Sequence, residues 1–156
     1  MPVRVQTEDF DAGRELAALR NADPSIGAVA AFIGTVRDVN AHASVSSMTL
    51  EHYPGMTEKA LSSIVAEAKS RWTIAEALVV HRVGPLEPAD QIVLVAVTSA
   101  HRGEAFAACE FIIDYLKTRA PFWNKEETAD GARWVEARAS DDDAAARWQG
   151  ATKPVA

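Results

Sequence analysis

Residues Thr98–Glu127 read TSAHRGEAFAACEFIIDYLKTRAPFWNKEE and contain one long amphipathic helix with cations near both of its ends. Ser99 is a residue of the N-cap type, and Pro121 stops the helix because the residue before a proline disfavours the α conformation. Between them, apolar residues recur at helical spacing and predict one buried stripe: Ala105, Phe106, Cys109, Ile112, Ile113 and Leu116.

The cations of this helix stand where helix stability does not require them. His101 and Arg102 fall in the first turn, where each cation opposes the helix dipole by roughly 0.3–1 kcal/mol. Unpaired backbone N–H groups with an arginine and a histidine form a ready anion site, which indicates phosphate or carboxylate chemistry. Near the other end, Lys117 lies at the border of the apolar stripe, where a lysine can be half buried.

Each of these signals also has an ordinary structural explanation. A surface arginine and a capping histidine account for His101 and Arg102 about equally well. Lys117 can form a surface pair with Asp114, three residues before it. Arg37 follows an apolar strand and can be a simple loop charge, although binding groups favour loops at the ends of strands. Their co-occurrence favours a site, and the residues alone leave both alternatives open.

Composition narrows the class of protein. The chain has 156 residues, of which 48% are hydrophobic and 24% charged, as in an ordinary globular domain. A formal charge of -6 argues against nonspecific nucleic-acid binding. No apolar run approaches the ~18 residues of a membrane span, and the N-terminus lacks the apolar core of a signal peptide. Because the single cysteine, Cys109, fits a reducing compartment, we expect a cytoplasmic protein.

Hydrophobic periodicity and turn residues predict the order of the elements. Strands are predicted at Val3–Val5, Ile26–Val36, Met48–Tyr53, Ala77–Val83, Ile92–Thr98, Phe122–Glu127 and Arg133–Ala137, the last two joined around Asp130-Gly131. Further helices are predicted at Ala12–Arg20, Thr57–Trp72 and Asp141–Trp148, and loops at Arg37–Ala43 and Gly84–Asp90. This order indicates an α+β fold with a mixed or antiparallel sheet, in one domain over residues 1–148, followed by a disordered tail over 149–156.

Several other chemistries find no support. The four histidines are scattered and accompany one cysteine, so no zinc site is expected. Cys109 falls inside the apolar stripe, which favours a core residue over a nucleophile. Neither GxGxxG nor GxxxxGK[ST] occurs, so no nucleotide site is indicated.

Four motifs resemble the catalytic large subunit of molybdopterin synthase. They are LEHYPGMTEKAL (Leu50–Leu61), VTSAHR (Val97–Arg102), DYLKTRAPFWNKE (Asp114–Glu126) and RWVEAR (Arg133–Arg138), and the likeness runs from about Gly27 to Trp148. The resemblance implies an α/β hammerhead-type fold with a small additional antiparallel β subdomain. It also implies a homodimer in which each subunit binds a small ubiquitin-like sulfur carrier ending in Gly-Gly, giving a heterotetramer.

The resemblance further implies a sulfurtransferase. The C-terminal thiocarboxylate of the carrier would donate sulfur to cyclic pyranopterin monophosphate (precursor Z), and two transfers would form the dithiolene of molybdopterin. No cofactor and no metal are implied for this subunit. The alternatives are a non-catalytic docking subunit for a Gly-Gly tail, which needs only apolar strands and an anion site, and a phosphate-ester hydrolase, for which paired carboxylates or metal ligands are missing.

Family site residues can be carried over by motif. The resemblance implies Lys117 as the catalytic lysine and, as substrate-binding residues, Thr35, Val36, Arg37, His101, Arg102, Asn124, Lys125 and Glu126. The chain departs from the family after Trp123, where many relatives have lysine and this chain has Asn124 followed by Lys125. Either a β-bulge turns Lys125 into the site or Asn124 substitutes by hydrogen bonding. We favour the bulge, although without one Lys125 would point away from the site.

Overall fold

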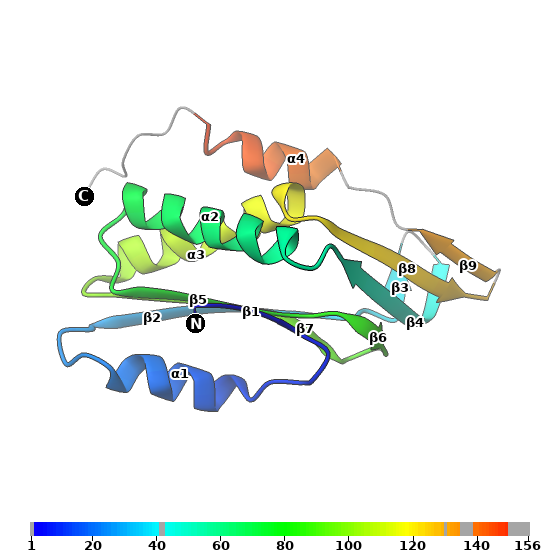
Figure 1. Cartoon of the computed structure of the whole chain (residues 1–156), viewed down its shortest axis with the longest axis horizontal. Coiled ribbons are helices and arrows are strands. Elements are labelled where there is room, and N and C mark those ends of the chain that lie inside the picture. Colours follow the sequence, from blue (N-terminus) through cyan, green and yellow to red (C-terminus); the bar gives the residue numbers. More distant parts are fainter. Residues whose placement is uncertain (1, 41–42, 130, 135–138, 150–156) are drawn as a thin grey trace.

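The computed structural model describes residues 2–40, 43–129, 131–134 and 139–149, and it has the predicted α+β architecture (Figure 1). The main sheet has four strands in the order β1, β5, β7, β2, with bounds Val3–Gln6, Glu76–Arg82, Gln91–Ser99 and Ala28–Thr35. β1 pairs in parallel with β5, and the other pairs are antiparallel, so the sheet is mixed as predicted. β2 is an edge strand that pairs only with β7 among the described strands.

Helices cover both faces of this sheet (Figure 1). α1 (Ala12–Asn21) lies on one face over Phe10 and alternate residues of β5 and β7, among them Leu78 and Leu94. α2 (Met56–Arg71) and α3 (Arg102–Arg119) lie on the other face, over Val79 and Val95. Since successive strand residues point to opposite faces, a sheet covered on both sides needs a continuous apolar run, which explains IVLVAV in β7.

A second, antiparallel sheet extends beyond the ends of α2 and α3 (Figure 1). It contains β3 (Val39–Asn40), β4 (Ala43–His52), β8 (Phe122–Thr128) and β9 (Gly131–Trp134) in that order, and β6 (Gly84–Leu86) also pairs with β4. β4 begins earlier than predicted, and β3 and β6 lie in segments predicted as loops. Strands of two or three residues leave no periodic signal, so only the pairing with β4 reveals them.

The ends of α3 and its buried face differ in detail from the prediction. The N-cap is His101, whereas Ser99 is the last residue of β7, and its hydroxyl accepts a hydrogen bond from the N–H of His101 (3.4 Å). Phe106 was predicted in the buried stripe but is 65% exposed, while Phe111 and Tyr115 are buried instead. The buried face of α3 therefore includes the aromatic residues Phe111 and Tyr115 but not Phe106.

The C-terminal part of the chain is described only in segments. α4 (Ala139–Ala146) begins two residues before the predicted helix and packs on α3. The predicted strand Arg133–Ala137 is described only to Trp134, since residues 135–138 lie outside the described residues, as does 150–156 of the predicted tail. No helix within the described ranges is long and apolar enough to span a membrane.

Candidate functional site

The predicted cations lie at the two opposite ends of α3. His101 is the N-cap and Arg102 the first residue of the helix, whereas Lys117 lies in its last turn. With a rise of about 1.5 Å per residue, the 16 residues between His101 and Lys117 separate their backbones by about 24 Å. One copy of the chain therefore cannot bring these groups together around one small substrate.

His101 is placed by a close backbone contact at the start of α3. The N–H of Gly27 donates to the carbonyl of Ser99 (3.0 Å), and a Cβ at Gly27 would lie 2.3 Å from the carbonyl oxygen of Ala100. Only glycine fits this approach. The side chains of His101 and Arg102 are exposed, and the imidazole forms no capping hydrogen bond to the helix. The helix start thus presents both side chains to solvent.

Lys117 is exposed in the single chain, which differs from the half-buried position expected at the edge of the stripe. The helix turns Leu116, the preceding residue, into the core and leaves Lys117 about 100° away from it. Its ammonium group is nevertheless close enough to His81, at the end of β5, to influence it electrostatically. Lys117 therefore lies where α3 passes the end of β5.

His81 is a feature of this region that the motifs did not indicate. The imidazole is 3% exposed, stacks on Phe122 with ring centroids 3.8 Å apart, and its Nδ1 lies 2.8 Å from the carbonyl oxygen of Arg82. The pKa of His81 is lowered to about 3, mainly by burial; the hydrogen bond to Arg82 opposes this shift, and the charges of Lys117 and His52 add to it. A polar residue at the end of the apolar run ALVVHR was the available sequence signal.

The segment after β2 reaches the same end of the molecule. The side chain of Val36 is buried with Met48, Leu50 and Leu86, a cluster against which Phe122 also packs. The N–H and carbonyl of Val36 are bonded to Asp90 and Ala89. Val36 thus anchors the segment, while its neighbours Thr35 and Arg37 are exposed.

β8 has two chemically distinct faces. Phe122, Asn124 and Glu126 point toward the buried side, and Trp123 and Lys125 point to solvent. The pairing with β4 is regular from Phe122 to Glu127, so this stretch contains no bulge that would turn Lys125 inward.

The two faces of β8 place its charged and amide side chains in different surroundings. Lys125 instead lies over the ring of Trp134, with Nζ 5.7 Å from the centroid. On the inner face, Glu126 is 5% exposed, and Oδ1 of Asn124 is buried without a hydrogen-bond partner among the described residues. Asn124, not Lys125, therefore shares a face with Phe122.

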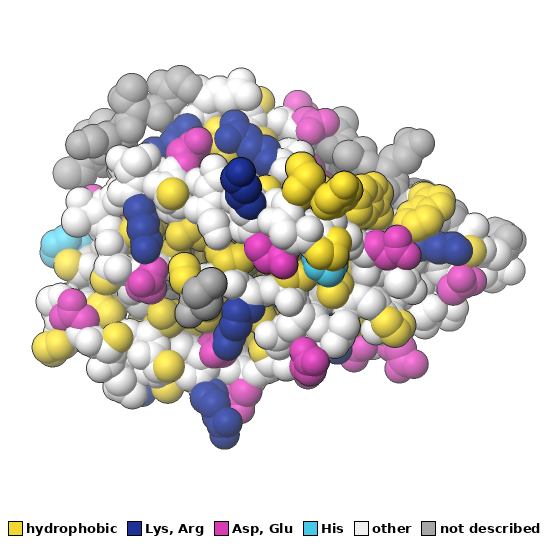
Figure 2. Space-filling view, in the orientation of Figure 1, with side chains coloured by type: hydrophobic (Ala, Val, Ile, Leu, Met, Phe, Trp, Pro, Cys, Tyr) yellow, Lys and Arg dark blue, Asp and Glu magenta, His cyan; other side chains and the backbone are white. Residues whose placement is uncertain are grey.

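The outer face of β8 carries exposed aromatic side chains. Trp123 is 45% and Trp134 56% exposed, and the rings of Trp123 and Tyr53 lie 6.4 Å apart. Figure 2 shows hydrophobic side chains gathered over the N-terminal end of α2 and the start of β8. Trp123 and Trp134 are therefore not part of the core.

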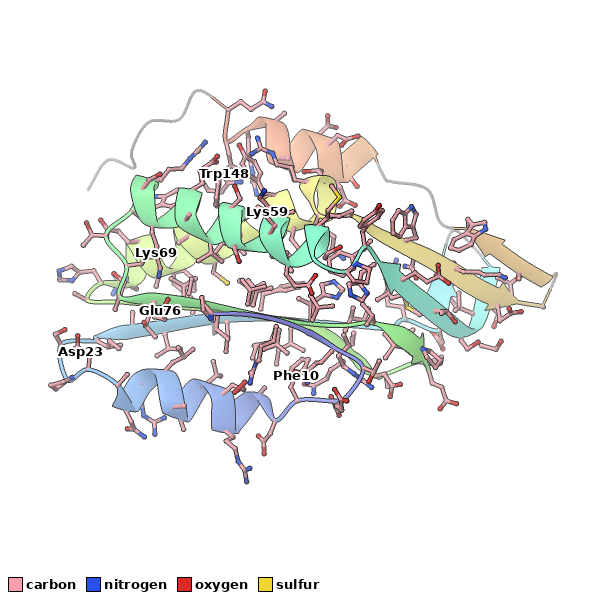
Figure 3. All side chains as sticks on the ribbon, viewed as in Figure 1. Phe10, Asp23, Lys59, Lys69, Glu76 and Trp148 are labelled. Atoms are coloured by element: carbon pink, nitrogen blue, oxygen red, sulfur yellow. The ribbon has the colours of Figure 1, made fainter. Side chains whose placement is uncertain are left out.

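A cavity of about 420 Å³ lies at the C-terminal end of α2 and contains none of the predicted site residues. It is lined by residues 69–74 and Glu104, and the ammonium group of Lys69 at its edge is paired with Glu76 at 2.8 Å (Figure 3). Cys109 is buried as predicted, and burial raises the pKa of its thiol to about 11. Within the described ranges, no three His, Cys, Asp or Glu side chains group as metal ligands.

Comparison with known proteins relates this architecture to one family. Residues 5–119 match the family model described as MoaE protein. A molybdopterin synthase catalytic subunit from Ralstonia nicotianae is 68% identical over 146 residues, which cover 94% of this chain and 83% of the relative.

Solved structures agree with the sequence comparison. A molybdopterin biosynthesis MoaE protein from Burkholderia ambifaria has a TM-score of 0.81 and 61% identity, covering 94% of this chain and 96% of that one. A chain of the Helicobacter pylori molybdopterin-converting factor shares the fold, with a TM-score of 0.73 at 17% identity over 88% of this chain and 92% of that one. The family match and the high identity together show that this chain belongs to the MoaE family, the catalytic subunits of molybdopterin synthase.

Proposed function

We propose that this chain is a cytoplasmic sulfurtransferase that moves sulfur from the C-terminal thiocarboxylate of a ubiquitin-like carrier to cyclic pyranopterin monophosphate. The observation that carries the proposal is the common location of Lys117, the Thr35–Arg37 segment and the inner face of β8 around His81 and Phe122. These are separate parts of the sequence: Lys117 and the inner face of β8 lie in the motif Asp114–Glu126, and the Thr35–Arg37 segment lies at the end of β2 and just after it.

The charges of this region suit the proposed chemistry. The substrate is a cyclic phosphate, and opening its ring frees a phosphate oxygen, so negative charge grows as sulfur is transferred. Arg37 supplies a guanidinium group that can bind phosphate through two hydrogen bonds. Lys117 acts either by proton transfer or by stabilising the carboxylate that remains on the carrier tail. The sulfur comes from the carrier, so the buried thiol of Cys109 is not required.

The remaining cations, His101 and Arg102, enter the site from a second copy. β2 is an edge strand with exposed apolar residues: Val29, Phe32 and Ile33 are 37%, 39% and 40% exposed. Such an edge is a template for pairing with another strand. A homodimer in which two β2 strands pair antiparallel about a two-fold axis buries these residues.

Strand register determines what this dimer brings together. Ala28 pairs with Ser99, beside the start of α3, and Thr35 pairs with Gln91 at the opposite end of β2. Antiparallel pairing of two β2 strands sets Ala28 of one copy beside Thr35 of the other. Because α3 packs over β2 and β7, its N-terminus in one copy then approaches Arg37 and Lys117 of the other. The dimer thereby completes an anion site that one chain leaves divided.

The carrier is the second partner, and one of each per chain makes a heterotetramer. Its support is the family membership, together with the Helicobacter pylori relative, which was solved as a protein–protein complex of subunits 1 and 2. A non-catalytic docking subunit would need the same tail-binding surface without the lysine, and membership of a family of catalytic subunits speaks against it.

The test combines the purified chain, thiocarboxylated carrier and precursor Z, with molybdopterin as the readout. Lys117→Ala is expected to lower the rate by about 100-fold or more while carrier binding is retained. Lys69→Ala, at an exposed helical lysine, is the matched control and keeps the wild-type rate. Wild-type turnover by Lys117→Ala would refute the catalytic assignment, and carrier binding without product by the wild type would favour the docking subunit.

A further inference from the structure

The atom balance of the proposed sulfur transfer requires a molecule of water. The thiocarboxylate of the carrier tail becomes a carboxylate, so the tail loses one sulfur atom and gains one oxygen atom. Once the tail sulfur has bonded to a substrate carbon, tail and substrate are joined through a thioester. Water then attacks the acyl carbon: a C–O bond forms, the C–S bond breaks, and its electron pair leaves as a thiolate on the substrate.

This hydrolysis releases two protons, and the first of them needs a base. One proton leaves the water as it attacks the acyl carbon, and the second leaves when the new carboxylic acid ionises. A positioned base that takes the first proton speeds such a step by about 100- to 10,000-fold. The charged ammonium group of Lys117 cannot be that base, because it has no lone pair.

His52 lies on the inner face of the second sheet, opposite Phe122. It is the last residue of β4, and its register partner in β8 is Phe122. Residues directly opposite in an antiparallel pair share a face, with Cβ atoms about 4.5–5.5 Å apart. Leu50 and Met48, two and four residues earlier, are on the same face of β4 and are buried with Val36. His52 therefore continues, at the end of the strand, the face that forms the proposed site.

The surroundings of His52 suit the exchange of a proton. Its side chain is partly exposed, so a proton taken up in the site can pass on to solvent. His52 and Lys117 are both close enough to His81 to act on it electrostatically, which places the three groups at one end of the site. Imidazole is also the side-chain group that exchanges protons most readily near neutral pH.

Two other groups of this region are less suited to be the base. The imidazole of His81 is 3% exposed, and its Nδ1 donates to the carbonyl oxygen of Arg82. Mainly because of burial its pKa is about 3, so it accepts a proton poorly near neutral pH. Glu126, on the inner face of β8, is 5% exposed and is therefore shut off from the solvent that must receive the proton. Of these three groups, His52 combines a basic nitrogen with access to water.

We propose that His52 is the general base that takes a proton from the water that hydrolyses the thioester between carrier tail and substrate. This inference rests on the proposed sulfur transfer, since the thioester exists only in that reaction. Lys117 stays charged and stabilises the oxyanion that forms on the acyl group as water adds. His52 releases its proton to solvent before the next transfer.

The test follows a single turnover of wild type and His52→Ala with thiocarboxylated carrier and precursor Z. His52→Ala is expected to form the thioester and to hydrolyse it about 100-fold more slowly, so mass spectrometry of the quenched carrier should find the carrier–substrate adduct. Added imidazole should speed this hydrolysis about tenfold, a rescue that a purely structural role does not predict. In water enriched in heavy oxygen, the carboxylate released by the wild type should carry the label.

Glu51→Gln is the matched control, because Glu51 is the neighbour of His52 on the outer, exposed face of β4. At saturating carrier it should hydrolyse the thioester at the wild-type rate. His52→Gln keeps a larger side chain at the strand end, and it takes the place of His52→Ala if circular dichroism shows that the alanine variant is unfolded.

Wild-type turnover by His52→Ala would overturn the inference, and so would accumulation of the adduct in Glu126→Gln instead. A released carboxylate without heavy oxygen would overturn it as well. Loss of product without any adduct in His52→Ala would also refute it, because His52 would then act before the thioester forms. Absence of product with the wild-type chain would count against the proposed function itself.

Discussion

His81 should make the stability of this protein fall steeply in mild acid. Its imidazole is buried, and burial is the main reason why its pKa is lowered from 6.5 to about 3. In the unfolded chain the same imidazole is solvated and binds a proton near pH 6.5. Between these two values the unfolded state holds one more proton than the folded state, so the free energy of unfolding decreases as pH falls.

The size of the effect follows from the two pKa values. Each pH unit inside the window changes the free energy of unfolding by about 1.4 kcal/mol for one proton. The contribution of neutral His81 is fully present above pH 6.5 and is lost progressively as pH falls toward 3. Between pH 7 and pH 5 the loss amounts to about 2 kcal/mol. Carboxylates, with ordinary pKa values near 4, contribute mainly below this range.

Urea titrations at pH 7 and pH 5, at one protein concentration, measure the loss directly. His81→Gln is expected to be less stable at pH 7, because the stacking on Phe122 disappears, and to lose about 2 kcal/mol less than the wild type on acidification. Phe122→Leu is the control, since it removes the stacked ring but keeps the imidazole and its pH dependence. An equal loss in wild type and His81→Gln would show that His81 is not the titrating group.

Two further predictions concern the departure from the family motif and the start of α3. Asn124→Ala should raise the Michaelis constant for precursor Z severalfold, whereas Lys125→Ala should leave it nearly unchanged. Of these two residues, only Asn124 lies on the inner face of β8. The opposite ranking would mean that Lys125 reaches the substrate. Gly27→Ala should lower the free energy of unfolding in urea by about 1–3 kcal/mol, because its Cβ would meet the carbonyl of Ala100. Gly103→Ala has open space around the new Cβ and should raise the free energy of unfolding by about 0.5–1 kcal/mol. Similar effects of both variants would refute the close approach at Gly27.

The sequence predicted the long elements because their periodicity is a direct consequence of burial. The continuous apolar run IVLVAV, which lies between two helical layers, and the periodic stripe of α3 are examples, although the predicted stripe included the exposed Phe106. The N-cap of α3 was predicted at Ser99 because serine is a frequent cap, but Ser99 still pairs with Ala28 as part of β7. Pairing between strands overrode the local capping preference there.

The arrangement of the site was harder to predict than its members. The sequence placed His101 and Arg102 at one end of the long helix and Lys117 near the other, but the resemblance gave them one common site without showing how one chain could bring together groups about 24 Å apart. The prediction that Lys125 points into the site required a β-bulge. The regular pairing of β8 with β4 contains no bulge between Phe122 and Glu127, so Lys125 points to solvent. His81 lies outside every recognised motif. Its low pKa and its position depend on Phe122 and Lys117, two residues distant in sequence, so no local sequence pattern indicated either.

The exposure of Lys117 connects the proposed chemistry with the proposed assembly. In a single chain the Lys117 side chain is exposed, and nearby solvent weakens its electrostatic action on a developing charge. Two partners are proposed for this region: the second copy, which pairs along the edge of β2, and the carrier, whose tail enters the site. Each would remove water from the region between α3 and β8. Lys117 would then act in a low-dielectric site only in the complete assembly, when substrate, tail and the partner's cations are all present, so sulfur transfer would be confined to that state.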